Sequence, residues 1–207
     1  MTAFRPSSSG FGFALKRLFD IITSLALLII LSPLLIIIAI LIRVTEGAPI
    51  LYAWRVVGKN GKPFVGYKFR TMVLNADAQK EKLRAQNEMR GPVFKIKDDP
   101  RVTRIGKILR RYSLDELPQL WSVLIGTMSM VGPRPPLQSE YVKFSDWQKK
   151  KLAMKPGMTS LWQIRGKPQD FDDWVKLDLE YIEHWSLGLD VKILFETFLV
   201  VVRGKNY

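Results

Sequence analysis

The longest apolar run in the chain covers residues 21–42, which contain no charged side chain. Its length matches the roughly 20 apolar residues that a bilayer-crossing helix needs. Ser32-Pro33 interrupts the run near its middle, where the proline removes a helical hydrogen bond and favours a bend. The Ser32 hydroxyl could satisfy a carbonyl that the bend leaves free. Basic residues flank both ends, so the charge distribution does not indicate which end of the helix lies on the cytoplasmic side. The pattern leaves open a kinked transmembrane helix or a helix that enters the membrane, bends and returns.

Short aromatic and β-branched segments follow the apolar run. Residues 50–54 and 64–69 flank a glycine-containing turn at residues 58–63, which predicts a β-hairpin. Residues 74–89 are rich in Ala, Gln, Glu, Lys and Arg, which predicts an exposed helix.

Apolar residues recur at helical spacing in the second half of the chain. In residues 102–109 the apolar side chains fall on one face of a predicted basic helix. Such a helix suits either a membrane interface or the protein surface, packed on the core. Further helices are predicted at residues 117–125, 147–154, 171–185 and 189–202. The predicted fold class is α+β and mostly helical: a broken N-terminal membrane helix, a small hairpin, and amphipathic helices around a catalytic core.

Charge is distributed unevenly along the chain. The net charge of +13 consists of +3 in residues 1–43, +10 in residues 44–111 and 0 in residues 112–207. A basic region directly after an apolar segment indicates attraction to anionic lipid headgroups or to a phosphorylated substrate, with nucleic acid as the competing interpretation. The absence of cysteine excludes disulfides and thiolate chemistry, and a single histidine, His184, leaves acid–base chemistry mostly to carboxylates and lysines.

The most distinctive polar stretch is residues 113–120, where Asp115 and Glu116 lie in an apolar frame. Ser113 and Glu116 have the spacing of a capping box. Because Pro118 would remove a hydrogen bond in the second turn, the helix could instead begin at Pro118, with the carboxylates just before it. Either way the carboxylates lie at a helix N-terminus, which favours an anion. Taken alone, these residues favour an ordinary helix start over a site.

Two cations and two carboxylates complete the candidate set. Arg134 lies in a stiff loop with three prolines, where it suits phosphate binding, although such an arginine is more often only solvated. Lys167 follows a glycine. Asp178 and Asp190 fall on predicted helices, and the pattern alone favours a surface charge or a cap for each.

Taken in order, these motifs resemble the bacterial sugar transferase family of monotopic phosphoglycosyl transferases, over roughly residues 13–203. The resemblance rests on Lys16-Arg17-Leu18-Phe19-Asp20, Ser32-Pro33, Tyr67-Lys68-Phe69-Arg70-Thr71-Met72, residues 113–120, Val131-Gly132-Pro133-Arg134-Pro135, Lys155-Pro156-Gly157-Met158-Thr159, Trp162-Gln163, Trp185-Ser186-Leu187 and Leu189-Asp190.

The resemblance implies a reaction. Such enzymes transfer a sugar 1-phosphate from a UDP-sugar to undecaprenyl phosphate and release UMP, through a covalent phosphosugar–aspartate intermediate with Mg²⁺. Asp115 would be the nucleophile and the Mg²⁺ ligand, and Glu116 its catalytic partner. Substrate-binding positions carried over are Lys68, Arg70, Arg110, Arg134, Lys167, Asp178 and Asp190.

The resemblance also implies an organisation and a setting. We expect a flexible tail at residues 1–12, a re-entrant membrane helix at 13–43 broken at Ser32-Pro33, and a cytoplasmic, membrane-associated catalytic domain at 44–207. The expected location is the cytoplasmic face of the bacterial inner membrane, in polysaccharide biosynthesis. Expected partners are a UDP-sugar, undecaprenyl phosphate and anionic lipids, with no nucleic acid, and apolar interfacial helices would suit a homodimer.

Two positions depart from the family pattern. Ser160 replaces the usual glycine, and Gly166-Lys167 replaces the usual Gly-Arg, which would turn a bidentate contact into a point charge. Both bear on donor preference, and nothing in the sequence identifies the sugar.

Overall fold

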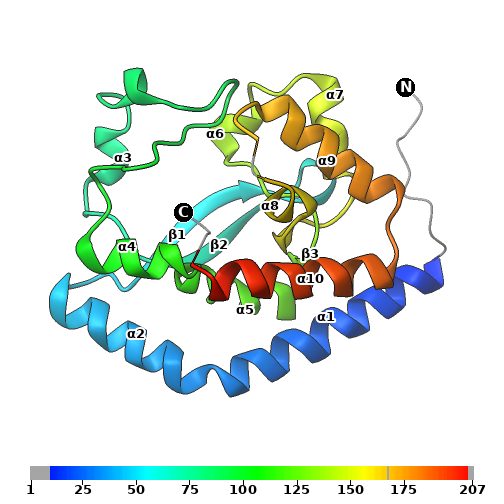
Figure 1. Ribbon diagram of the computed structural model, residues 1–207, viewed down its shortest axis with the longest axis horizontal. Helices are drawn as coiled ribbons and strands as arrows, with labels where there is room; N and C mark the ends of the chain where they lie inside the picture. Colours follow the sequence, from blue (N-terminus) through cyan, green and yellow to red (C-terminus); the bar gives the residue numbers. More distant parts are fainter. Residues whose placement is uncertain (1–9, 167, 205–207) are drawn as a thin grey trace.

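The computed structural model describes residues 10–166 and 168–204 (Figure 1). Two N-terminal helices, α1 (Gly10–Ile30) and α2 (Ser32–Thr45), form a bent base along one side of the molecule. In Figure 1, α4 (Arg104–Arg111), α5 (Gln119–Leu124) and α10 (Leu187–Val202) lie in a layer above this base. A β-hairpin crosses the centre, and the other short helices lie beyond it.

The bend between α1 and α2 is 60°. Ser32 Oγ donates to the carbonyl of Ile29 at 2.8 Å. That carbonyl lies four residues before Pro33, so it is the one that the proline leaves without an N–H donor. The predicted break at Ser32-Pro33 is therefore confirmed, together with the compensating role of Ser32. No single described helix is long and apolar enough to cross a membrane, whereas this bent pair meets both criteria when taken together.

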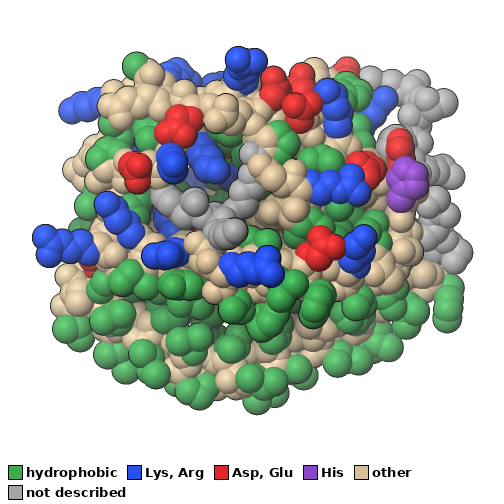
Figure 2. Space-filling view, viewed as in Figure 1, with side chains coloured by type: hydrophobic (Ala, Val, Ile, Leu, Met, Phe, Trp, Pro, Cys, Tyr) green, Lys and Arg blue, Asp and Glu red, His purple; other side chains and the backbone are tan. Residues whose placement is uncertain are grey.

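Large apolar side chains cover the outer face of the base, and Lys and Arg side chains gather above them (Figure 2). On α1 and α2 the large apolar residues that are more than half exposed are Phe11, Leu18, Ile22, Ile29, Ile30, Ile36, Ile37, Ile40 and Val44. A contiguous apolar surface of this kind marks an interaction with a membrane or another apolar partner.

The predicted hairpin is confirmed, and its strands extend further toward the turn than expected. β1 (Leu51–Val57) pairs antiparallel with β2 (Pro63–Phe69). The connecting 3₁₀ turn η1 (Lys59–Gly61) contains two residues with positive φ, Asn60 at 58° and Gly61 at 77°. Asn and Gly tolerate that conformation best, so the turn follows from its sequence.

A second small sheet was not predicted. β3 (Ser129–Val131) pairs in parallel with β4 (Gly157–Thr159). A Cβ placed on Gly157 would collide with the backbone of Gly132, so only glycine allows the two chains to approach this closely. The loop that carries Arg134 follows β3 directly, so the sheet fixes the start of this loop.

The predicted helices at residues 171–185 and 189–202 are confirmed as α9 (Phe171–Glu183) and α10. The predicted basic helix at residues 102–109 is present as α4. The remaining short elements are α3 (Ala76–Gln79), η2 (Arg84–Gln86), η3 (Leu114–Glu116), α6 (Gln138–Tyr141), α7 (Asp146–Lys149), η4 (Lys150–Ala153) and α8 (Leu161–Ile164). The prediction of one helix over residues 74–89 is wrong, because only the single turns α3 and η2 form there. With few apolar side chains to bury, tertiary packing does not stabilise a longer helix.

Apolar packing joins the base to the hairpin. Ile38 and Ile42 of α2 pack with Phe69 of β2 and Leu109 of α4 in one buried cluster. A larger cluster lies among α5, β3, α9 and α10, and a third, rich in aromatic side chains, lies around Trp162. α2 is thus packed directly against the strand that carries Lys68.

Buried polar contacts hold α1 in place. Lys16 Nζ lies 2.6 Å from Asp190 of α10, and both side chains are almost fully buried. The Asp190 carboxylate also accepts from the Tyr181 hydroxyl at 2.7 Å and from Trp185 Nε1 at 3.2 Å. Three donors therefore contact the two oxygens of Asp190 and fix the position of the carboxylate.

Two further side chains of α1 bind backbone groups. Arg17 donates to the carbonyls of Val123 and Leu124 at 2.6 Å each, so it satisfies the C-terminal end of α5. Asp20 accepts from the backbone N–H of Met130 at 2.9 Å. α1 is therefore joined to α5, β3 and α10.

Candidate active site

A cavity of about 460 Å³ opens between the hairpin, η3 and the loop that follows β3. Six of the predicted site residues line it: Lys68, Arg70, Arg110, Asp115, Glu116 and Arg134. They come from segments that are far apart in the chain, so the fold gathers the two carboxylates and four cations into one place.

The two carboxylates lie on η3, a single 3₁₀ turn between α4 and α5. The predicted capping box is wrong: Ser113 has a φ of 50°, and its side chain does not cap the turn. The alternative prediction, a helix that begins at Pro118, is closer to the structure, because α5 begins at Gln119. The left-handed residue and the proline confine the carboxylates to a short, stiff turn.

Glu116 is paired with Lys68 of β2. Lys68 Nζ lies 2.5 Å from Glu116 Oε1 and 4.3 Å from the centre of the Trp54 ring. Burial alone would raise the pKa of Glu116, but the positive charge and hydrogen bond of Lys68 outweigh burial and hold the pKa below its usual value. Glu116 is therefore an anion throughout the physiological pH range.

Asp115 has the opposite character. Burial first, and then the negative charge of Glu116, raise its pKa from 3.8 to about 6, against the opposing charges of Lys68 and Arg110. The helix start was expected to hold Asp115 ionised. The structure instead makes it a carboxylate that is mostly ionised at pH 7 and becomes protonated below pH 6, which is typical of a group adapted for chemistry.

The cations around the carboxylates are held in different ways. Arg110 Nε donates to Thr71 Oγ1 at 2.9 Å, and the Arg134 guanidinium lies 5.3 Å from the centre of the Trp174 ring. Arg70 is buried, and its Nη2 donates to the carbonyls of Glu46 and Gly47 at 2.6 and 3.0 Å. Arg70 thus fixes the backbone that leaves α2, in addition to lining the cavity.

Two of the predicted site residues that the structure describes do not line the cavity. Asp178 is fully buried and pairs with Lys151 at 2.6 Å, and Asp190 is paired with Lys16. Both carboxylates lie where they can support the scaffold, and their expected contacts with substrate stay a prediction. Lys167 lies outside the described residues.

Several cavity residues were missed by the sequence interpretation. They are Trp54, Phe94, Lys95, Gln163 and Trp174, together with Asp77, Asp99 and Arg101 at another part of the wall. Trp54 could have been found, because a hairpin with the predicted turn places it on the same face as Lys68. The others come from loops, from the short helices α3 and α8, and from α9, and their approach to the cavity depends on long-range packing.

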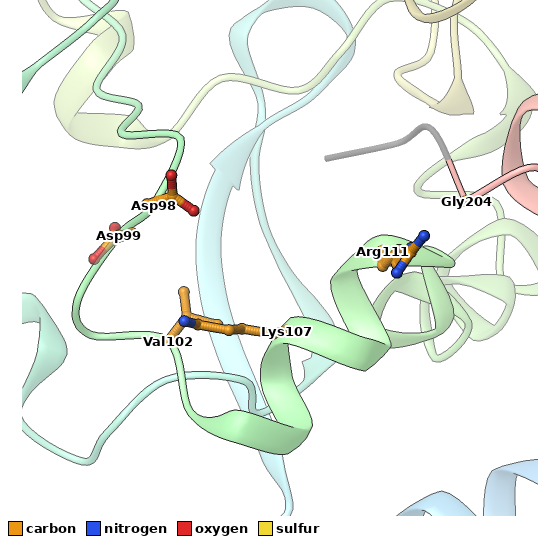
Figure 3. Close-up of a pocket in the computed structure, with 6 residues that line it drawn as sticks. All are labelled: Asp98, Asp99, Val102, Lys107, Arg111 and Gly204. Carbon is orange, nitrogen blue, oxygen red and sulfur yellow. The ribbon is translucent and has the colours of Figure 1, made fainter.

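A second hollow of about 350 Å³ lies beside the main cavity (Figure 3). Its lining residues are Asp98, Asp99, Val102, Lys107, Arg111 and Gly204. Asp99 is held by Arg101 through Nε at 2.9 Å and Nη2 at 2.5 Å. A carboxylate neutralised in this way is not available as a nucleophile, so the main cavity is the candidate active site.

Comparison with known proteins identifies relatives along most of the chain. The chain is 45% identical over 195 residues to an undecaprenyl-phosphate galactose phosphotransferase from Salmonella typhimurium, covering 91% of this chain and 40% of that protein. It is 38% identical over 205 residues to a UDP-glucose:undecaprenyl-phosphate glucose-1-phosphate transferase from Klebsiella pneumoniae, covering 95% and 41%.

A shorter relative matches along most of its length. The exopolysaccharide production protein ExoY from Sinorhizobium fredii is 38% identical over 196 residues, covering 92% of this chain and 87% of that protein. The chain therefore spans about two fifths of its longer relatives and most of this one. The model of the family described as bacterial sugar transferase matches residues 11–204. The chain belongs to the bacterial sugar transferase family.

Proposed function

We propose that the protein transfers a sugar 1-phosphate from a UDP-sugar to undecaprenyl phosphate and releases UMP, as the first membrane step of polysaccharide or glycoconjugate synthesis. The observation that carries the proposal is the Asp115–Glu116 pair in a cation-lined cavity, on the same molecule as a broken apolar helix. The names of the relatives, which specify galactose or glucose phosphate transfer to undecaprenyl phosphate, support it.

The chemistry proceeds in two displacements at one phosphorus atom. An Asp115 oxygen attacks the sugar-bearing phosphorus of the donor, an O–P bond to Asp115 forms, and the P–O bond to UMP breaks. A phosphate oxygen of undecaprenyl phosphate then attacks the same phosphorus and displaces Asp115. Covalent catalysis of this kind lets a soluble donor and a lipid acceptor use the same site in turn.

The surrounding side chains serve these displacements. Arg110 and Arg134 line the cavity and can stabilise the charge that develops on the phosphoryl oxygens. Glu116 stays anionic because Lys68 pairs with it, and its charge raises the basicity of Asp115. A more basic carboxylate is a better nucleophile, provided that the pH keeps it ionised.

Asp115 is also the residue expected to hold Mg²⁺. Among residues 10–166 and 168–204 there is no cluster of three or more acidic or histidine side chains that could hold a metal ion. Mg²⁺ commonly takes only one or two protein carboxylates and completes its shell with water and substrate phosphates, so the Asp115–Glu116 pair fits it. A bound Mg²⁺ would neutralise part of the diphosphate charge.

The proposed setting is the cytoplasmic face of the bacterial inner membrane. The apolar outer face of α1 and α2 would lie in the bilayer as a re-entrant helix, and the cations above it would contact anionic headgroups (Figure 2). The helix break has its own hydrogen bond from Ser32, as a bend at membrane depth requires. Exposed Trp121 and Phe195 on α5 and α10 would lie at the interface or at a homodimer contact.

Cysteine labelling tests the topology. With single cysteines introduced at Ser8 and Lys59, we expect a membrane-impermeant maleimide to label neither site in intact spheroplasts and both in inverted vesicles. The reason is that a bend at Pro33 returns the chain to its starting side. Substituting leucine for Pro33 should straighten the helix and place the two cysteines on opposite sides. Opposite sides in the wild-type background would establish a single crossing.

The transfer itself is tested with donor alone. Incubation with a UDP-sugar and Mg²⁺, without lipid, should release UMP up to one equivalent per site and add one phosphosugar mass to the intact protein. A panel of UDP-sugars would identify the donor. UMP release that requires the lipid from the start would replace the covalent route with a direct displacement. No release with any UDP-sugar, in the presence of lipid, would indicate a membrane-anchored binding protein.

A further inference from the structure

The hairpin places three residues on one face beside the carboxylates. Trp54 of β1 lies directly opposite Gly66 of β2, and opposed residues of an antiparallel pair point to the same face. Lys68 follows Gly66 by two positions, so it shares that face. Trp54 and Lys68 both line the catalytic cavity.

Gly66 leaves room for the indole. A Cβ placed on Gly66 would collide with Trp54 Nε1 and lie about 3 Å from two further ring atoms. The indole therefore lies flat across the glycine, and Trp54 is only 6% exposed. Glycine weakens a strand interior, so its presence here fits a demand for close packing.

The indole in turn supports Lys68. The ammonium lies 4.3 Å from the ring centre on one side and 2.5 Å from Glu116 Oε1 on the other. A lysine has four flexible methylene groups, so a pairing with a single carboxylate does not by itself fix the position of its charge. The ring face supplies a second attraction that confines the ammonium to the carboxylate.

We propose that Trp54 is a positioning residue, whose ring rests on Gly66 and holds Lys68 against Glu116. This arrangement keeps the positive charge of Lys68 beside the two carboxylates of the cavity. The inference rests on the proposed function for its kinetic consequence, whereas the placement of Lys68 can be measured without any transfer.

The position of this ammonium matters because Lys68 pairs with Glu116, the neighbour of Asp115, and lines the same cavity. If the ammonium moves away, Glu116 loses its paired cation, and the place where the donor phosphates would bind loses a positive charge.

The kinetic test compares Trp54→Leu, Trp54→Phe and Gly66→Ala with Val65→Ala, an exposed position on β2. The rate of donor-only adduct formation is measured at pH 7. We expect Trp54→Leu and Gly66→Ala to lower this rate about tenfold. Trp54→Phe, which keeps a ring face, should restore most of the rate, and Val65→Ala should match the wild type.

Amine labelling tests the placement of Lys68 directly. A limiting amount of acetic anhydride, followed by peptide mass spectrometry, reports how accessible and reactive Lys68 is in each folded variant. We expect at least a threefold rise in Lys68 acetylation in Trp54→Leu and Gly66→Ala, with no rise in Trp54→Phe or Val65→Ala. Failure of the proposed function would abolish adduct formation in every protein and leave this pattern intact.

Two results would overturn the inference. One is unchanged Lys68 labelling in both Gly66→Ala and Trp54→Leu. The other is an unchanged rate of adduct formation in both of these variants when they fold. If Trp54→Leu does not fold, Gly66→Ala and Trp54→Phe still give opposite expected results in both measurements.

Discussion

Replacing Asp115 with asparagine is expected to lower the rate of sugar-phosphate transfer by at least about 10³-fold, because the amide cannot form the acyl phosphate. The adduct with donor alone should disappear, as measured by intact-protein mass spectrometry, and UMP release should fall to background. The buried site accommodates the isosteric amide, so the protein should still fold and bind membranes.

The same substitution should stabilise the fold at alkaline pH. Asp115 has a folded-state pKa of about 6 against 3.8 when exposed, so its contribution to stability is present below pH 4 and is lost as the pH rises through 6. Above that range the ionised carboxylate costs about 3 kcal/mol. The melting temperature of Asp115→Asn in detergent should exceed that of the wild type at pH 8 and equal it near pH 4.

Glu116→Gln is the matched control for this prediction. The pKa of Glu116 is lowered by folding, so its ionised form stabilises the fold above its exposed pKa, and the amide should destabilise the protein at pH 8. Two results would contradict these expectations for Asp115→Asn. If this variant kept a tenth of the wild-type activity, Asp115 would not be the nucleophile. If it melted at a lower temperature than the wild type at pH 8, the assigned balance of burial and charge at Asp115 would be wrong.

Replacing Lys16 with methionine is expected to be the most destabilising single change. Methionine has a similar length, but it leaves the Asp190 carboxylate buried with no positive partner. Breaking a buried ion pair from one side costs about 3–5 kcal/mol, which corresponds to a fall of roughly 10 °C in melting temperature for a domain of this size.

Two further variants make the result interpretable. Lys192→Met disrupts an exposed pair with Glu196, at 4.0 Å on α10, and should cost at most about 1 kcal/mol. The double variant Lys16→Met with Asp190→Leu removes both charges and should recover most of the lost stability. If Lys16→Met melted like Lys192→Met, the buried pair would not anchor α1.

Local patterns predicted the parts of the fold that local chemistry determines. The helix break follows from Ser32-Pro33, the hairpin from its glycine-containing turn, and α9 and α10 from apolar spacing. The single helix expected at residues 74–89 does not form, since helix propensity without a buried face is insufficient. The β3–β4 sheet pairs segments about 28 residues apart with only three residues each, and no short-range signal marks such a pairing.

The prediction of site residues was also limited by what local sequence patterns can show. Asp115, Glu116 and the cations Lys68, Arg110 and Arg134 were identified as motifs and meet in one cavity. Asp178 and Asp190 belong to equally distinctive motifs, yet they form buried ion pairs with Lys151 and Lys16 and do not line the cavity. A motif indicates that a carboxylate is needed, whereas the fold shows which carboxylates line the cavity.

The contacts that hold α1 in place also determine when it can dock. Arg17 binds a carbonyl 106 residues later, Asp20 a hydroxyl 109 residues later and Lys16 a carboxylate 174 residues later. At 5–20 residues per second, a ribosome needs about 10–35 s to extend the chain from Lys16 to Asp190. Throughout that interval α1 is complete, but Asp190, the buried partner of Lys16, has not been made. Docking onto the rest of the protein is therefore a late event in biogenesis, after the apolar segment has left the ribosome.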